Sequence, residues 1–359
     1  MKIERKKRRV KVVILMVMMV VMMVMGCNSG GVKGEGTGGG EGRGLSGAMM
    51  EVGRSAESAF YAFIELMSDT LGLRVNKDTK RNAVGEYFNG LGVKLGEASD
   101  ELEKVASKAT SGVDKSDALK NPIRVVVDAA KEVLSSLKGY LESLKDIGDD
   151  TKVGEATSNQ NGVAAADGEL KKAYKALKGI VDMADKEGVA KPKVGDIAVK
   201  VDNADNKDGA KVLAAGTTAG AAVGEKAAAI VSSVSGEEIL ASIVKSGEVD
   251  AAINADVTAG TSALSFAKGS NNAGNLAKEA AKAGAVAGGI ALRSLVKDGK
   301  LAGHNTNSDE KTVQSAGVSA VNKLLGAVEE IVRKTVKNIL EKVKQEVDKA
   351  RDPKAVGQQ

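Results

Sequence analysis

The sequence is poor in the side chains from which most binding and catalytic sites are built. Its 359 residues include no Trp, four Tyr, four Phe, one Cys and one His. Nucleic-acid binding needs aromatic stacking platforms beside basic patches, so the scarcity of rings sets that class of partner aside. Rings also bring the largest buried areas, so the core must depend on many small contacts among Ala, Val, Leu and Ile.

The single histidine restricts the chemistry further. His304 lies in the polar stretch 303–307, which reads as a loop, where an imidazole is usually solvated. No second His is available for a His-bearing metal site or a Cys/His pair. Adjacent carboxylates such as Glu237 and Glu238 do not face each other on a helix. The sequence therefore predicts no catalytic residue, no metal site and no cofactor. We expect that the protein is not an enzyme, with only catalysis by carboxylates alone left open.

The net charge points to no partner either. The whole chain has 52 basic and 47 acidic residues, which gives a net charge of +5. Residues 1–26 hold seven of the basic residues and one acidic residue, so the rest of the chain has a net charge of about −1. A chain of that charge has no source of long-range electrostatic steering.

The first 26 residues have the layout of a cleavable signal peptide. Seven basic residues lead into an unbroken apolar run of 14 residues at 12–25. At ~1.5 Å per residue, a helix of this length reaches roughly 21 Å, short of the ~30 Å that a permanent membrane span must cross. We expect this segment to direct export and then to be removed.

The apolar run ends in Val24, Met25, Gly26 and Cys27, and a small residue directly before cysteine resembles the lipobox of bacterial lipoproteins. The stricter bacterial pattern has Leu and then Ala or Ser where this chain has Val24 and Met25, whereas spirochaetal lipoboxes are looser. We therefore predict that Cys27 is lipidated and that the mature chain begins there. An ordinary secretory signal followed by a free thiol is the alternative.

A tether follows the cysteine. Residues 28–46 are dominated by Gly with a few Lys, Glu and Arg, and they cannot bury enough apolar area to order themselves. As a flexible coil, ~19 residues reach roughly 24 Å. We expect residues 27–46 to hold a folded domain away from a lipid surface.

Four segments repeat apolar residues at steps of three and four, which predicts amphipathic helices. These segments span about 49–71, 78–110, 121–148 and 315–350. The third opens with Asn121 as N-cap and Pro122 at the first helical position, and Gly148 suits its C-cap. Within a later stretch, Ser235 followed three residues on by Glu238 predicts a capping box.

The composition changes between these helices. Two loops at 148–168 and 188–209, the second with one short strand, flank a shorter helix at 169–186. Residues 210–291 are mostly Ala, Gly, Val and Ser. Because Gly is unfavourable within a helix, this composition predicts short helices that are stable only through tertiary packing.

Together these segments predict an all-α fold. We expect an elongated helical bundle with long N- and C-terminal helices and a cap of short helices and loops, with one or two very short strands. In chain order, the expected parts are a signal peptide, a lipidated tether, one helical domain with a cap, and a tail. Their limits are residues 1–26, 27–46, 47–352 (cap roughly 149–275) and 353–359.

Three segments resemble one known family. They are IALRSLVKDGKLA at 290–302, VNKLLGAV at 321–328 and VSGEEIL at 234–240. Together with the lipidated, Gly-rich start, they resemble the variable large protein (Vlp) family of relapsing-fever Borrelia, whose members are variable major outer-surface lipoproteins. The resemblance covers essentially the whole chain, and its specificity depends mainly on the block 290–302.

The resemblance implies an antigenically variable outer-surface lipoprotein. Such proteins are mostly helical, are displayed one version at a time, and are replaced when host antibodies arise. The chain would then be anchored in the cell outer membrane through its lipid and face the outside, with host antibodies as its partners. No catalytic residue and no host ligand come with the family, and whether the chain forms a homo-oligomer is left open.

Two other functions fit a tethered helical lipoprotein. A surface adhesin or host-factor binding lipoprotein would keep one exposed patch unchanged among its relatives. A periplasmic structural lipoprotein would be hidden from protease in intact cells. Protease treatment of intact cells separates the last of these functions from the other two.

The antigen hypothesis also makes a spatial prediction. The block 290–302 has a face of mostly small side chains suited to close helix packing, so we expect it to be buried where antibodies cannot reach. We place Arg293 towards the polar side of this block and Gly299 at the end of its helix as a cap. Exposure should fall instead on the loops 151–168 and 188–209.

Overall fold

The computed structural model describes residues 71–111, 114, 117, 121–201 and 204–351. The chain divides into two compact units, residues 1–45 and 46–359, and every described residue belongs to the second unit. The signal peptide, Cys27, the tether and the tail lie outside the described residues. So does the helix predicted over 49–71, except for its last residue, which is not helical.

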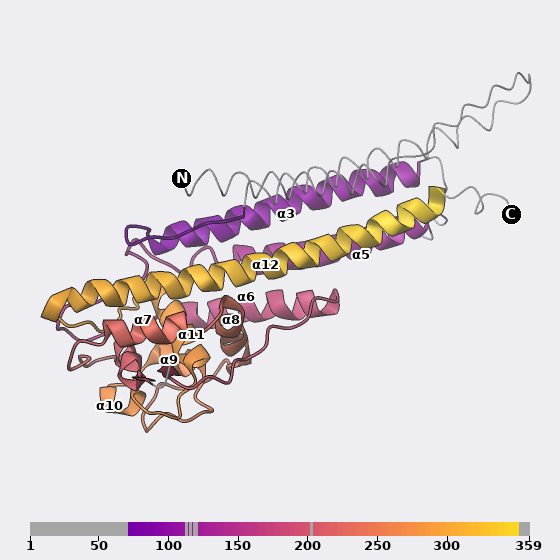
Figure 1. The fold of residues 1–359 in the computed structure, drawn as a ribbon. Helices are drawn as coiled ribbons and strands as arrows, with labels where there is room; N and C mark the ends of the chain where they lie inside the picture. Colours follow the sequence, from indigo (N-terminus) through magenta and orange to yellow (C-terminus); the bar gives the residue numbers. More distant parts are fainter. Residues whose placement is uncertain (1–70, 112–113, 115–116, 118–120, 202–203, 352–359) are drawn as a thin grey trace, which may run out of the picture. The chain divides into compact units, whose positions relative to one another are not determined.

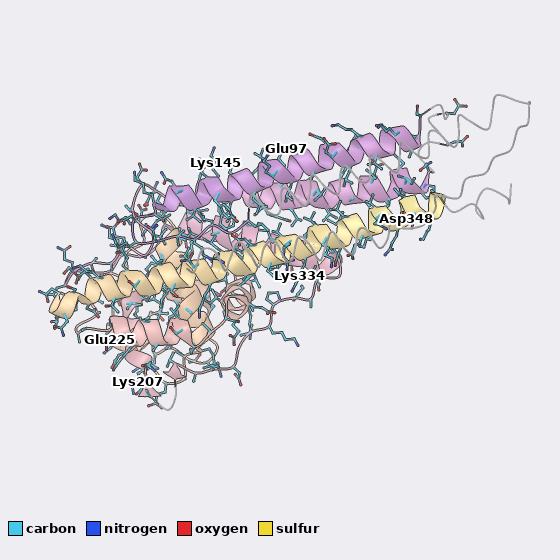
Figure 2. The ribbon with its side chains drawn as sticks, turned by 45° about the horizontal axis from the view of Figure 1, so that its top comes forward. Glu97, Lys145, Lys207, Glu225, Lys334 and Asp348 are labelled. Carbon is cyan, nitrogen blue, oxygen red and sulfur yellow. The ribbon has the colours of Figure 1, made fainter. Side chains whose placement is uncertain are left out.

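Four long helices form the body of this unit. They are α3 (Arg81–Ala109), α5 (Pro122–Glu142), α6 (Asp167–Lys186) and α12 (Asp309–Arg351). Figure 1 shows α3, α5 and α12 running side by side, and α5 also packs against α6. The outer faces of these helices carry charged side chains such as Glu97, Lys334 and Asp348 (Figure 2). The all-α fold predicted from the sequence is confirmed.

The predicted apolar stripes are the faces that these helices bury. Burying one large apolar side chain contributes roughly 1.5–3 kcal/mol, so the stripes, and not the exposed charges, hold the helices together. The buried members are Val84, Phe88, Leu91, Leu95, Leu102 and Val105 in α3, Ile123, Val127, Ala130, Leu134, Leu137 and Leu141 in α5, and Leu325, Val328, Val332, Val336, Ile339, Val343 and Val347 in α12.

Only the N-terminal end of α5 has the predicted cap. At its start, Asn121 Oδ1 accepts hydrogen bonds from the N–H groups of Ile123 (2.9 Å) and Arg124 (3.3 Å). The prediction that Gly148 caps the other end is wrong, because the helix ends six residues earlier. Gly148 instead packs on the backbone of Arg81, where a Cβ atom would lie 2.7 Å from the carbonyl carbon.

Short helices gather around the N-terminal half of α12 (Figure 1). In chain order they are η1 (Lys207–Leu213), α7 (Gly224–Ser232), α8 (Gly236–Lys245), α9 (Ala263–Lys268), α10 (Ala273–Leu276), α11 (Ala283–Leu295) and η2 (Thr306–Ser308). Every residue of α11 is buried, because α7, α8, α9 and α12 all pack against it. Its small residues allow this close approach: a Cβ atom on Gly288 would lie 2.9 Å from that of Ala263 in α9.

Helix α8 begins with the predicted capping box. Ser235 Oγ accepts a hydrogen bond from the N–H of Glu238 at 3.1 Å, and the Glu238 carboxylate accepts one from the N–H of Ser235 at 2.7 Å. Among the described residues, no single helix is long and apolar enough to cross a membrane. Helices α7 and α8 pass that test only as a pair, by length and composition, and they are bent by 95° where they meet.

The strand predicted near 197–201 is one arm of a hairpin. Strands β1 (Lys200–Val201) and β2 (Ala204–Asp205) pair antiparallel, with residue 200 opposite residue 205. Just before β1, Val199 is fully buried while Ile197 is exposed, so the alternation seen in the sequence does not place both side chains on one buried face. A two-residue pairing of this kind is held by its surroundings and not by its own hydrogen bonds.

Candidate functional site

The described residues do not bring together a catalytic or metal-binding cluster. In this part of the chain, no group of three or more His, Cys, Asp and Glu side chains is placed to hold a metal ion. His304 is half-buried, and its Nδ1 accepts a hydrogen bond from the N–H of Thr306 at 3.2 Å. The imidazole therefore supports a loop turn. Cys27 lies outside the described residues, and its lipidation stays a prediction.

The adjacent carboxylates on α12 have structural partners. Glu329 is nearly buried and accepts hydrogen bonds from the hydroxyl of Tyr87 at 2.6 Å and from the N–H of Gly72 at 3.2 Å. Burial and the bond to Glu329 raise the pKa of Tyr87, so the phenol stays protonated. Glu330 forms an exposed ion pair with Arg333 at 2.6 Å. These contacts tie α3 and the residues before it to α12, and they do not make an acid–base pair.

A shallow groove of about 560 Å³ lies on α12. Its lining residues are Arg74, Ser315, Val318, Ser319, Asn322, Lys323 and Gly326. The lining includes no carboxylate and no imidazole, so the groove offers no general base. Two of its polar side chains, Asn322 and Lys323, are already bonded to main-chain groups of neighbouring segments.

Arg293 is fully buried in the last turn of α11. The prediction that it lies towards a polar side is wrong. Its guanidinium donates from Nε to the carbonyl of Ala267 (2.9 Å), from Nη1 to that of Ala214 (2.7 Å) and from Nη2 to that of Phe266 (3.4 Å). Two of these carbonyls belong to the end of α9 and one follows η1, so one cation complements the negative ends of two helices. Burial lowers the pKa of Arg293 to about 9.

Arg81, the first residue of α3, holds the end of α11 and the loop that follows it. Its Nε donates to the carbonyl of Ser294 at 3.1 Å and its Nη2 donates to that of Gly299, while its Nη1 lies 3.4 Å from the carboxylate of Asp149. Desolvation lowers the pKa of Arg81, and the charge of Asp149 opposes that shift. The prediction that Gly299 caps α11 is wrong, because the left-handed residue is Asp298, with φ of 65°.

Two side chains of α12 hold the two ends of α7. The carboxylate of Asp309 accepts hydrogen bonds from the N–H of Gly224 at 2.6 Å and from that of the residue before it at 3.0 Å. The ammonium of Lys323 donates to the carbonyl of Val231 at 2.7 Å and to that of the next residue at 3.2 Å. A negative group at the start of a helix and a positive group at its end both stabilise the helix dipole. Desolvation lowers the pKa of Lys323.

Asparagines of α12 bind peptide groups in the same manner. Asn322 accepts a hydrogen bond from the N–H of Val75 and donates one to its carbonyl, both at 2.9 Å. It therefore pairs with Val75 much as a neighbouring β-strand would. Asn338 donates to the carbonyl of Glu187 at 3.0 Å, at the C-terminal end of α6.

The exposed surface of the described residues lies largely on loops around this core. In the predicted loop 151–168, exposure is greatest at 158–161, because the main chain on both sides pairs with residues 300–303. The stretch 188–198 is exposed in part, as predicted. The segment 247–262 is also widely exposed, with Val249 the extreme case at 86%, and within 214–222 Gly216 and residues 220–222 are exposed. The exposure of these last two segments was not predicted from the sequence.

The block 290–302 is buried, as predicted. Within it, Lys297 and Asp298 are exposed and Lys300 is half-buried, and the remaining residues are buried. The polar contacts that hold this block, at Arg293 and from Arg81, were missed by sequence reasoning. One signal was available, because an arginine in a run of Ala, Gly, Ile and Leu has no polar face of its own to join.

Known proteins resemble this chain along most of its length. A family model described as Borrelia lipoprotein matches residues 56–347. Variable large protein 25 of Borrelia hermsii is 66% identical over 319 residues, which cover 88% of each chain. Variable large protein 12 of Borrelia hermsii is 29% identical over 312 residues, which cover 87% of this chain and 85% of that protein.

A solved structure supports the same relationship. The variable surface antigen VlsE of Borrelia burgdorferi aligns with a TM-score of 0.69 and 25% sequence identity, covering 85% of this chain and 99% of that chain. The fold is therefore kept while most of the sequence changes.

Proposed function

The chain belongs to the Borrelia lipoprotein family, and we propose that it is an antigenically variable outer-surface lipoprotein. In this role one version is displayed at a time and is replaced when host antibodies recognise it. The observation that carries the proposal is the 66% identity to a variable large protein over 88% of both chains. The solved relative is likewise named as a variable surface antigen.

The arrangement of the described residues suits an antigen. Antibodies bind exposed side chains, so a variable antigen needs surface loops that change and a core that does not. Here the block 290–302 is buried, whereas residues 158–161 and much of 247–262 are exposed. Host antibodies are therefore the partners that we propose for these loops.

Anchoring is the finer part of the proposal. We place a diacylglyceryl group and an N-acyl group on Cys27, since one acyl chain holds a protein only marginally and two or more make anchoring stable. We place the anchor in the cell outer membrane with the helical domain facing the outside. The lipobox-like ending of the apolar run and the lipoprotein family support this arrangement.

Protease treatment of intact cells tests the proposed location. A protease added outside should remove the wild-type chain from intact cells while a periplasmic marker protein survives. Cells that carry Cys27→Ser provide the matched control, because this variant should be released in soluble form or remain as uncleaved precursor. Survival of the wild-type chain on intact cells, or an unmodified Cys27 in its intact mass, would contradict the proposal.

The rival function, a surface adhesin or host-factor binding lipoprotein, is separated by a second measurement on the same cells. Antibodies raised against this chain should bind cells that display it and fail on cells that display a relative of about 29% identity. An adhesin would instead keep one exposed patch in common between such relatives. Antibodies that recognise both cell types equally through the exposed loops would favour the adhesin.

A further inference from the structure

Side chains of α11 and α12 bond to the main-chain atoms of neighbouring segments. We call five of the side chains that make this contact the main-chain clamp: Arg293, Asp309, Asn322, Lys323 and Asn338. Gln314 and Glu329 of α12 make the same kind of contact with the residues before α3. The groups that the clamp binds lie at the end of η1, at both ends of α7, at the ends of α9 and α6, and in the residues before α3. In each of these contacts, a side chain of the clamp bonds to an N–H or carbonyl group of the partner's backbone.

A peptide group is the same in every residue. The carbonyls bonded by Arg293, Lys323 and Asn338 are present whatever side chain stands there, and only the N–H groups bonded by Asp309 and Asn322 exclude proline. The clamp therefore fixes the position of a segment without specifying its outward-facing side chains. By contrast, a side-chain ion pair would require both partners to be kept together.

We infer that the main-chain clamp divides this molecule into residues that must keep their identity and surface residues that are free to change, so that antigenic variation does not cost the fold. This inference rests on the proposed function and explains how the surface can serve it. The relatives agree with it in one respect: at 29% identity, a variable large protein still aligns with 87% of this chain.

The loop 247–262 shows the same division on a smaller scale. Ile253 donates its N–H to the carbonyl of Gly269 at 2.8 Å, and Val257 donates its N–H to that of Asn275 at 3.0 Å. The side chains of Ile253 and Val257 are buried, while residues 254–256 between them are exposed. Two buried apolar side chains and two main-chain hydrogen bonds thus hold residues 253–257 in place, while the side chains between them face solvent.

Removing Arg293 leaves the buried carbonyls of Ala214, Phe266 and Ala267 without this donor, which is costly because those groups have lost their water. Lysine in place of Arg293 keeps the charge but presents one ammonium where the guanidinium reaches three carbonyls with a planar fork. We therefore expect Arg293→Lys to loosen α9 and the end of η1 locally. The exposed Arg333, which pairs with Glu330 on the surface, provides the matched control as Arg333→Lys.

Hydrogen exchange of the purified mature chain, followed by mass spectrometry, measures this loosening segment by segment. In Arg293→Lys, amides at 214–216 and 266–269 should exchange at least ~10-fold faster than in the wild-type chain. In Arg333→Lys, exchange should match the wild-type chain. A milder variant, Asn338→Ala, removes a half-buried clamp residue and should speed exchange at 187–189 alone, which keeps the test decisive should Arg293→Lys fail to fold.

The second arm changes the exposed surface and keeps the clamp. Six exposed positions are replaced together: Ala221→Ser, Ala222→Ser, Ala251→Lys, Ala252→Ser, Asn254→Ser and Ala255→Lys. Exchange rates at 214–216 and 266–269 should match those of the wild-type chain. The melting temperature should stay within about 2 °C of the wild-type value, since substitutions at exposed positions rarely change stability.

Unchanged exchange in both clamp variants, or lost protection in the surface variant, would overturn the inference. Both readouts use purified protein and no antibody. They can therefore fail while the protease result on intact cells stands, and the reverse also holds.

Discussion

Antibody access to the block 290–302 depends on how often the folded domain opens. In the folded chain, the side chains of Leu292, Leu295 and Leu301 are buried, and only Lys297 and Asp298 are exposed. An antibody raised against a peptide of residues 288–302 needs most of these side chains at once. It can therefore bind this chain only when the block has separated from its neighbours.

The free energy of unfolding sets the size of this effect. A folded domain is stable by about 5–15 kcal/mol, and each ~1.4 kcal/mol is a factor of ten in an equilibrium constant. The peptide antibody should therefore bind the native chain at least ~1,000-fold more weakly than it binds the free peptide. Denatured protein should bind like the peptide.

A substitution outside the epitope can change this opening in a controlled way. Phe266 in α9 is fully buried, and α9 packs against α11. Phe266→Ala should lower the free energy of unfolding by about 3–5 kcal/mol, because it removes a ring and leaves a cavity. The open population, and with it antibody binding, should rise by about 100- to 4,000-fold. Val249→Ala is the matched control, because Val249 is 86% exposed.

The assay compares antibody affinity for purified native wild-type, Phe266→Ala and Val249→Ala chains, with thermal unfolding of each in parallel. Antibody binding should rise in step with the loss of stability, and intact cells that display the wild-type chain should bind weakly. Strong binding to those intact cells would refute the burial of the block. Equal binding by the Phe266 and Val249 variants would refute the link to opening.

Two further perturbations test the packing and the electrostatics of the helical unit. Val336→Asp should lower the free energy of unfolding by about 3 kcal/mol or more, because Val336 is fully buried on α12 and an unpaired carboxylate there is costly. Urea unfolding measures this change, and Gln345→Asp on the exposed face of the same helix is the control. Equal stability of the two variants would contradict the packing. Hydrogen bonds from Lys211 and then Lys226 lower the pKa of Asp208 to about 2. Because that folded-state pKa is depressed, the stabilisation is present above the unfolded value of about 4 and is lost as the pH falls towards about 2. Asp208→Asn should therefore unfold more easily than the wild-type chain at pH 6 and about equally at pH 2. A constant difference in the free energy of unfolding across that range would count against the ion pairs.

The predicted helices over 49–71 and 315–350 each have one apolar stripe that must be covered, so we predict that residues 49–71 pack against residues 321–350. Residues 49–70 lie outside the described residues, so this pairing stays a prediction. One described feature bears on it. Gly72 bonds to Glu329, Val75 bonds to Asn322, and the carbonyl of Lys77 accepts a hydrogen bond from Gln314, so residues 72–77 run antiparallel to α12.

The sequence by itself determined the long helices α3, α5, α6 and α12, most of their limits and, in α3, α5 and α12, the faces that they bury. This was possible because the relevant information is local. Apolar residues at steps of three and four make one stripe whatever lies elsewhere, as Val84, Phe88 and Leu91 do in α3. Caps are equally local, so Asn121 at the start of α5 and the box at the start of α8 were both predicted correctly. The absence of His and Cys partners likewise follows from composition alone.

Only the tertiary structure decided which polar side chains hold the fold together. Arg293 bonds to carbonyls 26 and 79 residues away in the chain, and Lys323 bonds to one 92 residues away. The sequence predicts a solvated position for each of them, because a long charged side chain normally remains in water, and only the apolar run around Arg293 signals otherwise. Their partners are peptide carbonyls, which every residue carries and which leave no mark in the sequence. The directions of these carbonyls are set only when α9, η1 and α7 have packed against α11 and α12. That packing aims the carbonyls at the cationic side chains, and the resulting hydrogen bonds offset the cost of removing those charges from water.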